Sequence, residues 1–176
     1  LGATVEFMTP REIRAHFGVH DRIRGGGWLN LKRGSVTDDT TMTLALGRAI
    51  VDTDGIDALA CARAFDAWMR EKPVDIGNTV RRGLVHFRAT GDTSVPLREE
   101  DAGNGACMRN LPVALLSLDD DRAFEADSIA QAHITHNHPL SDAATLALGH
   151  MARHLIRSCN IQACHSVAAA LVCAHP

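Results

Sequence analysis

The sequence contains no tyrosine, and phenylalanine and tryptophan bring the aromatic content to only 4% of its 176 residues. No apolar run approaches the roughly 18 residues of a membrane-spanning helix, and no basic-then-apolar signal segment opens the chain. The 18 lysines and arginines are scattered among 21 acidic residues and leave no basic footprint for nucleic acid or anionic lipid. These absences predict a cytoplasmic protein without direct membrane insertion and without a nucleic-acid partner.

Cysteine and histidine form no standard metal-binding pattern. The five cysteines are an odd number without a C-x-x-C pair, which disfavours both a disulfide framework and a zinc ribbon. The residues predicted to be buried, reduced thiols are Cys61, Cys107, Cys159, Cys164 and Cys173. The spacing of His133, His136 and His138 matches no structural zinc site, and His138, which precedes Pro139, is interpreted as a lead-in to a helix.

What the sequence does have is a helical period, carried by 45% apolar residues, which are enough for one hydrophobic core. Thr9, Glu12 and Gly18 predict the capping box and the end of a first short helix. Apolar residues at positions 42, 45, 46, 49 and 50 predict one face of an amphipathic helix that begins at Asp38.

Further helices follow along the rest of the chain. They are predicted over 57–70, from a cap at Asn78, over 105–118 with a kink at Pro112, and over 122–134, 140–157 and 160–174. The stretch "GGGWLN" at 25–30 lacks the strand and the Lys-Ser/Thr of a phosphate loop, and is interpreted as a flexible loop over a cleft. No segment alternates with a period of two, so the sequence predicts an all-α domain with its polar residues in the connections.

The stretch "GSVTDDTTMTLALG" places Thr37, Asp38 and Asp39 at the start of a predicted helix. Two explanations stay open. In the first, the acidic residues only complement the positive end of the helix dipole while Thr37 caps the first turn. Alternatively, the carboxylates and hydroxyls converge at a frayed first turn on hard cations such as Mg²⁺ or Mn²⁺.

Three other segments place Asp, Asn or His beside Gly or Pro at predicted helix boundaries, as in a cleft built from loop tips. They read "PVDIGNTVRRG", "EEDAGNGACMRNLPVAL" and "ITHNHPLSDAATLALGHMARHLI". Together with "LGATVEFM" and "GSVTDDTTMTLALG", and in this order along the chain, these blocks resemble the signature blocks of the ADP-ribosylglycohydrolase family.

The resemblance implies an all-α, orthogonal helical bundle, with residues 1–176 forming a single partial domain truncated at both ends. The family's second metal block, an Asp-x-Asp-Thr sequence, is not found after residue 157, and the segment that normally precedes "LGA" is absent. The implied activity is hydrolysis of the N-glycosidic bond between ADP-ribose and an arginine side chain of a target protein. It uses two divalent cations, Mn²⁺ or Mg²⁺, and half of their ligand set is expected to be missing from this chain.

The part of the family that this sequence resembles most acts on dinitrogenase reductase, the nitrogenase iron protein, and the removal reactivates that target. ADP-ribose itself and a nitrogen-status signalling protein are further expected partners. Carried over position by position, Thr37, Asp38 and Asp39 match metal ligands, and Glu6, near the ribose, joins Asp38 and Asp39 as a catalytic residue. The implied substrate-binding residues are Asp75 and Asn78 opposite the arginine, and Asp101, Gly103, Asn104 and His136 along the ADP-ribose cleft.

These residue types suit the reaction. Cleavage builds positive charge on the anomeric carbon, and cations held by carboxylates grip ribose hydroxyls and lower the pKa of a bound water. Asp75 suits a charge-assisted pair with a guanidinium, although it also fits a simple turn after Pro73, and backbone N–H groups of residues 103–105 suit a diphosphate. Three alternatives stay open: a glycohydrolase for another ADP-ribosylated substrate, an inert ADP-ribose-binding fragment, and a structural or regulatory helical domain.

Overall fold

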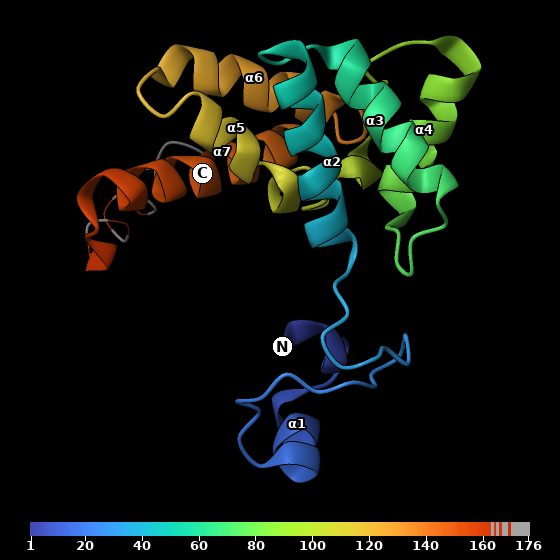
Figure 1. Cartoon of the computed structure of the whole chain (residues 1–176), viewed down its shortest axis with the longest axis vertical. Coiled ribbons are helices and arrows are strands. Elements are labelled where there is room, and N and C mark those ends of the chain that lie inside the picture. The colour runs from blue at the N-terminus through green and yellow to red at the C-terminus, as the bar shows by residue number, and fades with distance from the viewer. Residues whose placement is uncertain (163, 165, 167–168, 170–176) are drawn as a thin grey trace.

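A computed structural model describes residues 1–162, 164, 166 and 169, and its regular structure is helical (Figure 1). The elements in chain order are η1 (Gly2–Thr4), α1 (Pro10–Phe17), α2 (Asp38–Thr53), α3 (Ala58–Arg70), α4 (Asn78–Thr90), η2 (Glu99–Asp101), η3 (Cys107–Arg109), α5 (Leu111–Leu116), α6 (Asp121–His133) and α7 (Pro139–Ser158). Within the described residues there is no β-strand, and an isolated bridge joins Gly26 to Leu31. The predicted all-α fold class is confirmed.

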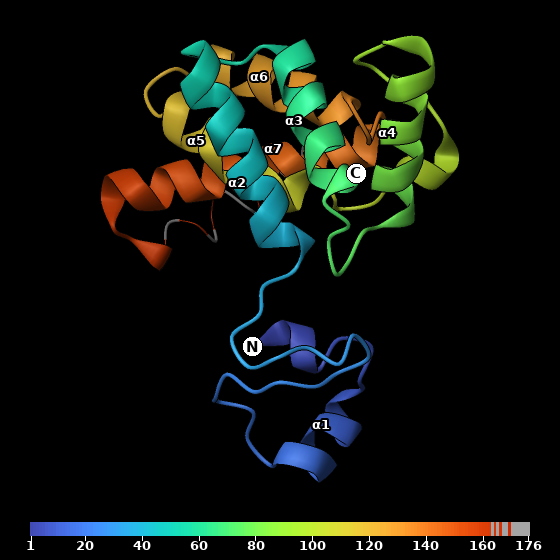
Figure 2. The ribbon, with the colours of Figure 1, turned by 45° about the vertical axis from the view of Figure 1, so that its right-hand side comes forward.

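The chain folds into two parts of very different character. Helices α2 to α7 form the bundle, whereas residues 1–36, with η1 and α1, hang below it on an extended connection that leads into α2 (Figures 1 and 2). None of the eight residues of α1, all of them described, is buried. The N-terminal segment therefore takes its order from its own turns and caps and not from a hydrophobic core.

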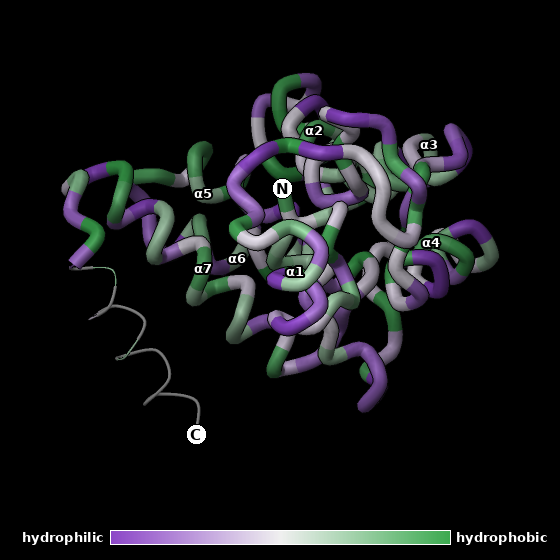
Figure 3. The backbone as a smooth tube through the Cα atoms, turned by 90° about the horizontal axis from the view of Figure 1, so that it is seen from below, coloured by the Kyte–Doolittle hydropathy of each residue, from purple (hydrophilic) through white to green (hydrophobic). Residues whose placement is uncertain are grey.

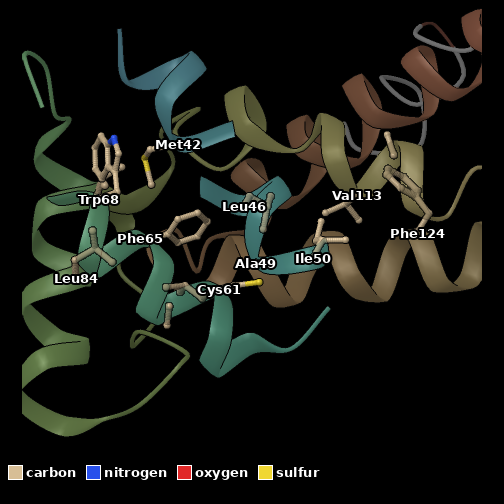
Figure 4. Close-up of a cluster of buried hydrophobic side chains, with 14 residues drawn as sticks. Met42, Leu46, Ala49, Ile50, Cys61, Phe65, Trp68, Leu84, Val113 and Phe124 are labelled. Carbon is tan, nitrogen blue, oxygen red and sulfur yellow. The ribbon is translucent and has the colours of Figure 1, made fainter. Parts of the chain in front are cut away.

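The hydrophobic core belongs to the bundle, with α2 at its centre. Met42 and Leu46 of α2 are fully buried against Cys61 and Phe65 of α3, in a cluster that runs from Leu84 of α4 to Phe124 of α6 (Figure 4). Burying a side chain of this size stabilises the fold by about 1.5–3 kcal/mol. The amphipathic face predicted for α2 is thus confirmed, and the packing fixes the direction in which the first turn of α2 points.

Helix ends agree with the sequence prediction where a side chain forms a capping hydrogen bond with nearby backbone. The Thr9 hydroxyl accepts a hydrogen bond from the Glu12 N–H at 3.3 Å, the Glu12 carboxylate accepts one from the Thr9 N–H at 2.6 Å, and Gly18 ends α1 with a φ of 66°. This capping box is the one predicted. Helix α2 ends at Thr53, and Asp54 follows in the left-handed conformation.

Two predicted boundaries are wrong. Gly77, not Asn78, is the N-cap of α4, and Asn78 is already helical. Residues 105–118 do not form one kinked helix, because η3 and α5 are separated at Asn110 and Pro112 lies in the first turn of α5. Proline suits that turn because its missing N–H would have no intrahelical partner there. The helix predicted over 160–174 lies mostly outside the described residues.

Cysteine placement is only partly as predicted. Cys61 and Cys164 are buried and Cys107 is half-buried, but Cys159 is exposed at the C-terminal end of α7, so its predicted burial is wrong. All four are free thiols, and Cys173 lies outside the described residues. Hydrophilic and hydrophobic residues mix along the helices (Figure 3), and no helix of the described residues has the length and apolar content needed to cross a membrane.

Candidate functional site

An open cleft of about 860 Å³ lies where the N-terminal segment faces the first turns of α2 and α4. The loop before η3 and the end of that short helix complete its wall. The lining includes seven residues singled out from the sequence: Glu6, Thr37, Asp38, Asp39, Asp75, Asn78 and Asn104. Segments up to about a hundred residues apart thus supply one cleft, which we call the acidic cleft.

The start of α2 supplies the polar floor of the acidic cleft. Thr37 occupies the N-cap position, but its hydroxyl makes no capping bond and instead donates to the Asp39 carboxylate at 3.0 Å. The predicted capping by the Thr37 side chain is therefore wrong. Thr41 donates to the Thr37 carbonyl at 3.2 Å and accepts from the Trp68 ring nitrogen at 2.8 Å, which ties the first turn of α2 to α3.

The charge of the acidic cleft is one-sided. Four carboxylates line it, those of Glu6, Asp38, Asp39 and Asp75, and none of the described residues in its lining is Lys, Arg or His. Asp38 is only 8% exposed. Burial, and after it the charges of Asp75 and Asp39, raises the pKa of the Asp38 carboxyl above its usual range. A cluster of this kind favours a cationic ligand.

The donor chemistry of the acidic cleft fits a hard divalent cation. Carboxylate and hydroxyl oxygens, which Mg²⁺ and Mn²⁺ prefer, gather at Thr37, Asp38 and Asp39, with Asp75 close enough to affect Asp38. Within the described part of the chain, however, no three His, Cys, Asp or Glu side chains converge as a metal-binding group. The described residues thus offer the right oxygens without a closed ligand set.

Trp28, which belongs to the stretch interpreted from the sequence as a loop over a cleft, forms part of the N-terminal wall. Its ring nitrogen donates to the Glu6 carboxylate at 2.9 Å, and its ring meets Phe7 edge-on with centroids 5.5 Å apart. Gly27 permits this arrangement, because a Cβ there would lie 2.9 Å from the carbonyl oxygens of both Ala3 and Thr4. The clue in the sequence was a tryptophan directly after three glycines in a chain that has only two tryptophans.

Three of the predicted substrate-binding residues lie outside this lining. Asp101 is 3% exposed, forms an ion pair with Arg82 of α4, and is not among the residues that line the cleft. Gly103 and His136 are likewise not among the lining residues, and His136 is 2% exposed. Of the "DAGNGA" loop, Asn104 is the residue that lines the acidic cleft, and substrate binding by Asp101, Gly103 and His136 stays a prediction.

His136 is held in a buried polar network, the His136 network, made by Arg109, Gln131, Thr135 and His136. The Arg109 guanidinium is fully buried and donates to the Gln131 side chain at 2.8 Å, to the Gln131 carbonyl at 2.9 Å and to the Thr135 hydroxyl at 2.9 Å. The Thr135 hydroxyl lies 2.8 Å from Nδ1 of His136. Burial, with the charges of Arg109 and Arg82, lowers the pKa of His136 to about 3, so its ring is neutral at pH 7.

The two glycines beside Asn104 both lie against the His136 ring, but to different degrees. A Cβ on Gly105 would meet the ring at 2.6 Å, whereas one on Gly103 would lie 3.4 Å from Nε2, an ordinary van der Waals distance. Neither glycine has a positive φ. Close approach, not an unusual backbone conformation, therefore requires glycine at residue 105, and a cradle for a diphosphate by residues 103–105 stays a prediction.

The other two histidines of the stretch 133–138 have structural partners. His138 is the N-cap of α7 and accepts from the Leu140 N–H at 3.1 Å, as its interpretation as a helix lead-in predicted. His133 lies 3.1 Å from the Asp142 carboxylate.

Comparison with known proteins identifies the family. The ADP-ribosylglycohydrolase family model matches residues 1–175. The chain is 50% identical over 175 residues to "ADP-ribosyl-[dinitrogen reductase] glycohydrolase" of Rhodospirillum rubrum, which covers 99% of this chain and 60% of that protein. It is 32% identical over 164 residues to "ADP-ribosylarginine hydrolase Tri1" of Serratia proteamaculans, covering 89% of this chain and 43% of that one.

A solved structure supports the same conclusion. An ADP-ribosylglycohydrolase-related protein complex matches with a TM-score of 0.77 at 28% identity, covering 95% of this chain and 55% of that chain. The chain thus spans about 60% or less of the length of these relatives. With matches this extensive in both sequence and fold, the chain belongs to the ADP-ribosylglycohydrolase family.

Proposed function

We propose that the protein removes ADP-ribose from an arginine side chain of a target protein by metal-dependent hydrolysis of the N-glycosidic bond. The observation that carries this proposal is the acidic cleft, where four carboxylates gather without a basic side chain among the described lining residues. Both features of the substrate that this reaction must handle are cationic, namely the arginine guanidinium and the ribose carbon that becomes positive as the bond breaks. Membership of the family supports the same reaction class.

Thr37, Asp38 and Asp39 are the residues that would hold the divalent cations, two Mn²⁺ or Mg²⁺ ions. When bound, such ions supply a water of lowered pKa and a grip on ribose hydroxyls. Asp38 suits this role because burial, and after it the charges of Asp75 and Asp39, raises its pKa, and no basic residue is in the described lining to offset these charges. The hydrogen bond from Thr37 to Asp39 orients that carboxylate toward the same floor of the cleft.

Asp75 would receive the guanidinium of the substrate, since a carboxylate binds that group through a charge-assisted pair. It lies in the loop before α4, beside Asn78, and both residues line the cleft. Glu6 would face the ribose from the N-terminal wall, where the bond from Trp28 holds it. As the C–N bond breaks, water adds its oxygen to the ribose carbon and the departing guanidine nitrogen gains a proton.

The proposed target is dinitrogenase reductase. It rests on the 50% identity to a relative whose name specifies that substrate, and the arginine linkage is supported by the name of the Serratia relative. A nitrogen-status signalling partner and a cytoplasmic location stay predictions. A second candidate, an inert ADP-ribose-binding domain, is favoured by one observation, since the described residues hold no converged group of three ligands.

The test is release of ADP-ribose from two ADP-ribosyl-arginine substrates, dinitrogenase reductase and an unrelated protein. Each is assayed with Mn²⁺ and with EDTA, using wild type, Asp38→Asn and the control Asp52→Asn, whose carboxylate lies near the other end of α2. We expect Mn²⁺-dependent release that is lost in Asp38→Asn and kept in the control. Binding of free ADP-ribose without release would support the inert domain, and release from the unrelated substrate alone would overturn the target.

A further inference from the structure

The His136 network lies directly behind the one part of the "DAGNGA" loop that reaches the acidic cleft. Asn104 lines the cleft, and its neighbours Gly103 and Gly105 rest on the His136 ring. Any change in the position of that ring must move these glycines, because a protein interior transmits such displacements through close packing. The network is therefore placed to control where Asn104 sits.

The hydrogen-bond chemistry of the network has one direction. A guanidinium can only donate, so the Thr135 hydroxyl must accept from Arg109. The hydroxyl proton then needs an acceptor of its own, and Nδ1 of His136 lies 2.8 Å away. If Nδ1 carried the proton, the buried hydroxyl proton would have no acceptor among the bonds of the described residues, so the hydroxyl is assigned as the donor and Nδ1 as the acceptor. Because Nδ1 accepts, the single ring proton of the neutral imidazole must be on Nε2, the atom that faces the glycines.

Burial leaves this chain of donors no alternative partner in water. Arg109, Gln131, Thr135 and His136 are each at most 2% exposed. The guanidinium also stacks on the Phe65 ring, 4.3 Å from its centroid, which anchors the start of the chain in the hydrophobic core. Among the ion pairs of the described residues, none joins Arg109 to a carboxylate. Its Nε and Nη2 donate within this network, and its buried Nη1 has no hydrogen-bond partner.

We propose that Arg109 and Thr135 are positioning residues for the reaction proposed above: they fix the His136 ring in its Nε2–H tautomer, and the ring holds Asn104 in the acidic cleft. His136 in this role acts through the loop and does not touch the substrate. The inference deepens the proposed function and rests on it for the role of Asn104, while the tautomer and the loop position are properties of the free protein.

The first experiment needs no ligand. Long-range ¹H–¹⁵N NMR on the ¹⁵N-labelled protein reports which ring nitrogen of His136 carries the proton, in wild type, Thr135→Val and Thr135→Ser. We expect Nε2–H in wild type and Thr135→Ser, which keeps the hydroxyl, and a shift toward Nδ1–H in Thr135→Val. A wild type protonated on Nδ1, or a Thr135→Val variant with an unchanged tautomer, overturns the relay.

Loop position is read in the same samples by amide hydrogen exchange at residues 103–105. The control is Thr145→Val, which removes another fully buried threonine hydroxyl, bonded within α7 to the Ser141 carbonyl and not part of the His136 network or of the cleft lining. We expect exchange at the loop to accelerate at least tenfold in Thr135→Val and to stay within twofold in Thr145→Val. Equal acceleration in both variants would mean that Thr135 contributes only general stability, and would overturn the proposal.

A double-mutant cycle tests the functional consequence with free ADP-ribose as the probe. We expect Thr135→Val to weaken ADP-ribose binding by roughly tenfold, the lower end of what loss of such supporting bonds does to a site. Thr135→Val combined with Asn104→Ala should bind no worse than Asn104→Ala alone. If the double variant lost affinity by the product of the two single losses, Thr135 would not act through Asn104. A wild-type protein that fails to bind ADP-ribose would overturn the proposed function instead. The tautomer measurement would keep its meaning, because it uses no ligand.

Discussion

The acidic cleft and the His136 network are neighbours that carry opposite charges in opposite surroundings. In the cleft, four carboxylates line an open space without a basic side chain among the described lining residues. In the network, a fully buried guanidinium is surrounded by neutral acceptors. Unpaired charge facing solvent is available to a ligand, whereas a buried charge whose donors are all directed inward fixes geometry. The acidic cleft is therefore suited to binding and catalysis, and the His136 network is suited to positioning the residues of the cleft.

The comparison is tested most severely by removing one cleft carboxylate. We expect Asp39→Asn to lower Mn²⁺-dependent release of ADP-ribose by at least about 100-fold, because loss of a metal-ligand charge removes stabilisation that the transition state requires. Initial rates at saturating substrate measure the effect. The matched change Asp52→Asn, at an exposed position of the same helix, should leave the rate within twofold. Equal rates for Asp39→Asn and wild type would remove the cleft from the reaction.

Removing the charge of the network should act on stability instead. We expect Arg109→Ala to lower the free energy of unfolding by about 3 kcal/mol, because it leaves the acceptors of Gln131 and Thr135 unpaired and a cavity beside Phe65. Urea unfolding gives the value. Arg81→Ala, at an exposed position of α4, should change it by less than about 0.5 kcal/mol. Similar losses in the two variants would show that burial of Arg109 contributes nothing special.

The contact between the two regions can be broken at a glycine. We expect Gly105→Ala to destabilise the fold by about 2 kcal/mol, because its Cβ would lie 2.6 Å from the His136 ring. Adding Gly105→Ala to His136→Ala should cost much less stability than Gly105→Ala costs in wild type, since the contact with the ring is then gone and the 3.2 Å contact with the Val80 side chain is what remains. Gly47→Ala is the control: it sits inside α2 with its nearest neighbour at 3.7 Å, and should stabilise by about 0.5–1 kcal/mol.

The smallest expected effect is a gain in stability, caused by Asp38→Asn. The pKa of the Asp38 carboxyl is raised in the folded state. The protonated carboxyl therefore contributes its full stabilisation below the pKa of the unfolded chain, and this stabilisation is lost as pH rises through the pKa of the folded state. At pH 7 the ionised group therefore opposes folding. We expect Asp38→Asn to raise the stability in EDTA by about 1 kcal/mol, or roughly 2–4 °C in Tm.

The same comparison repeated near pH 3, where both carboxyl and amide are neutral, should give equal melting temperatures. Added Mn²⁺ should reverse the order at pH 7 if the carboxylate binds the ion. A variant less stable than wild type at pH 7 without cations would show that Asp38 is not repelled by Asp75 and Asp39. The cleft would then lack the unpaired charge that distinguishes it from the network.

Sequence reasoning located what depends on neighbours along the chain. The capping box of Thr9 and Glu12 and the lead-in at His138 are contacts within three residues, and the apolar face of α2 repeats within two turns. The cap at Asn78 and the kink at Pro112 were misplaced because the backbone alone, without a side-chain bond, sets the first turns of α4 and α5.

The burial of Asp101 and His136 was beyond that reasoning for a different reason. Their surroundings depend on pairs distant along the chain, such as Arg82 with Asp101, 19 residues apart, and Arg109 with Thr135, 26 apart. No local pattern marks such pairs. The resemblance drew attention to the block that contains His136, but a shared motif does not distinguish a residue that touches a ligand from one that supports the residue that does.

The two tryptophans divide the molecule in a way that is useful at the bench. Trp28 stands in the cleft wall with 56% of its surface exposed, while Trp68 is 6% exposed in the bundle and bonded to Thr41. With no tyrosine in the chain, ultraviolet emission comes from these two indoles almost alone. Emission from a Trp68→Phe protein would follow events at the cleft, and emission from a Trp28→Phe protein would follow unfolding of the bundle. One instrument thus separates ligand entry from loss of the fold.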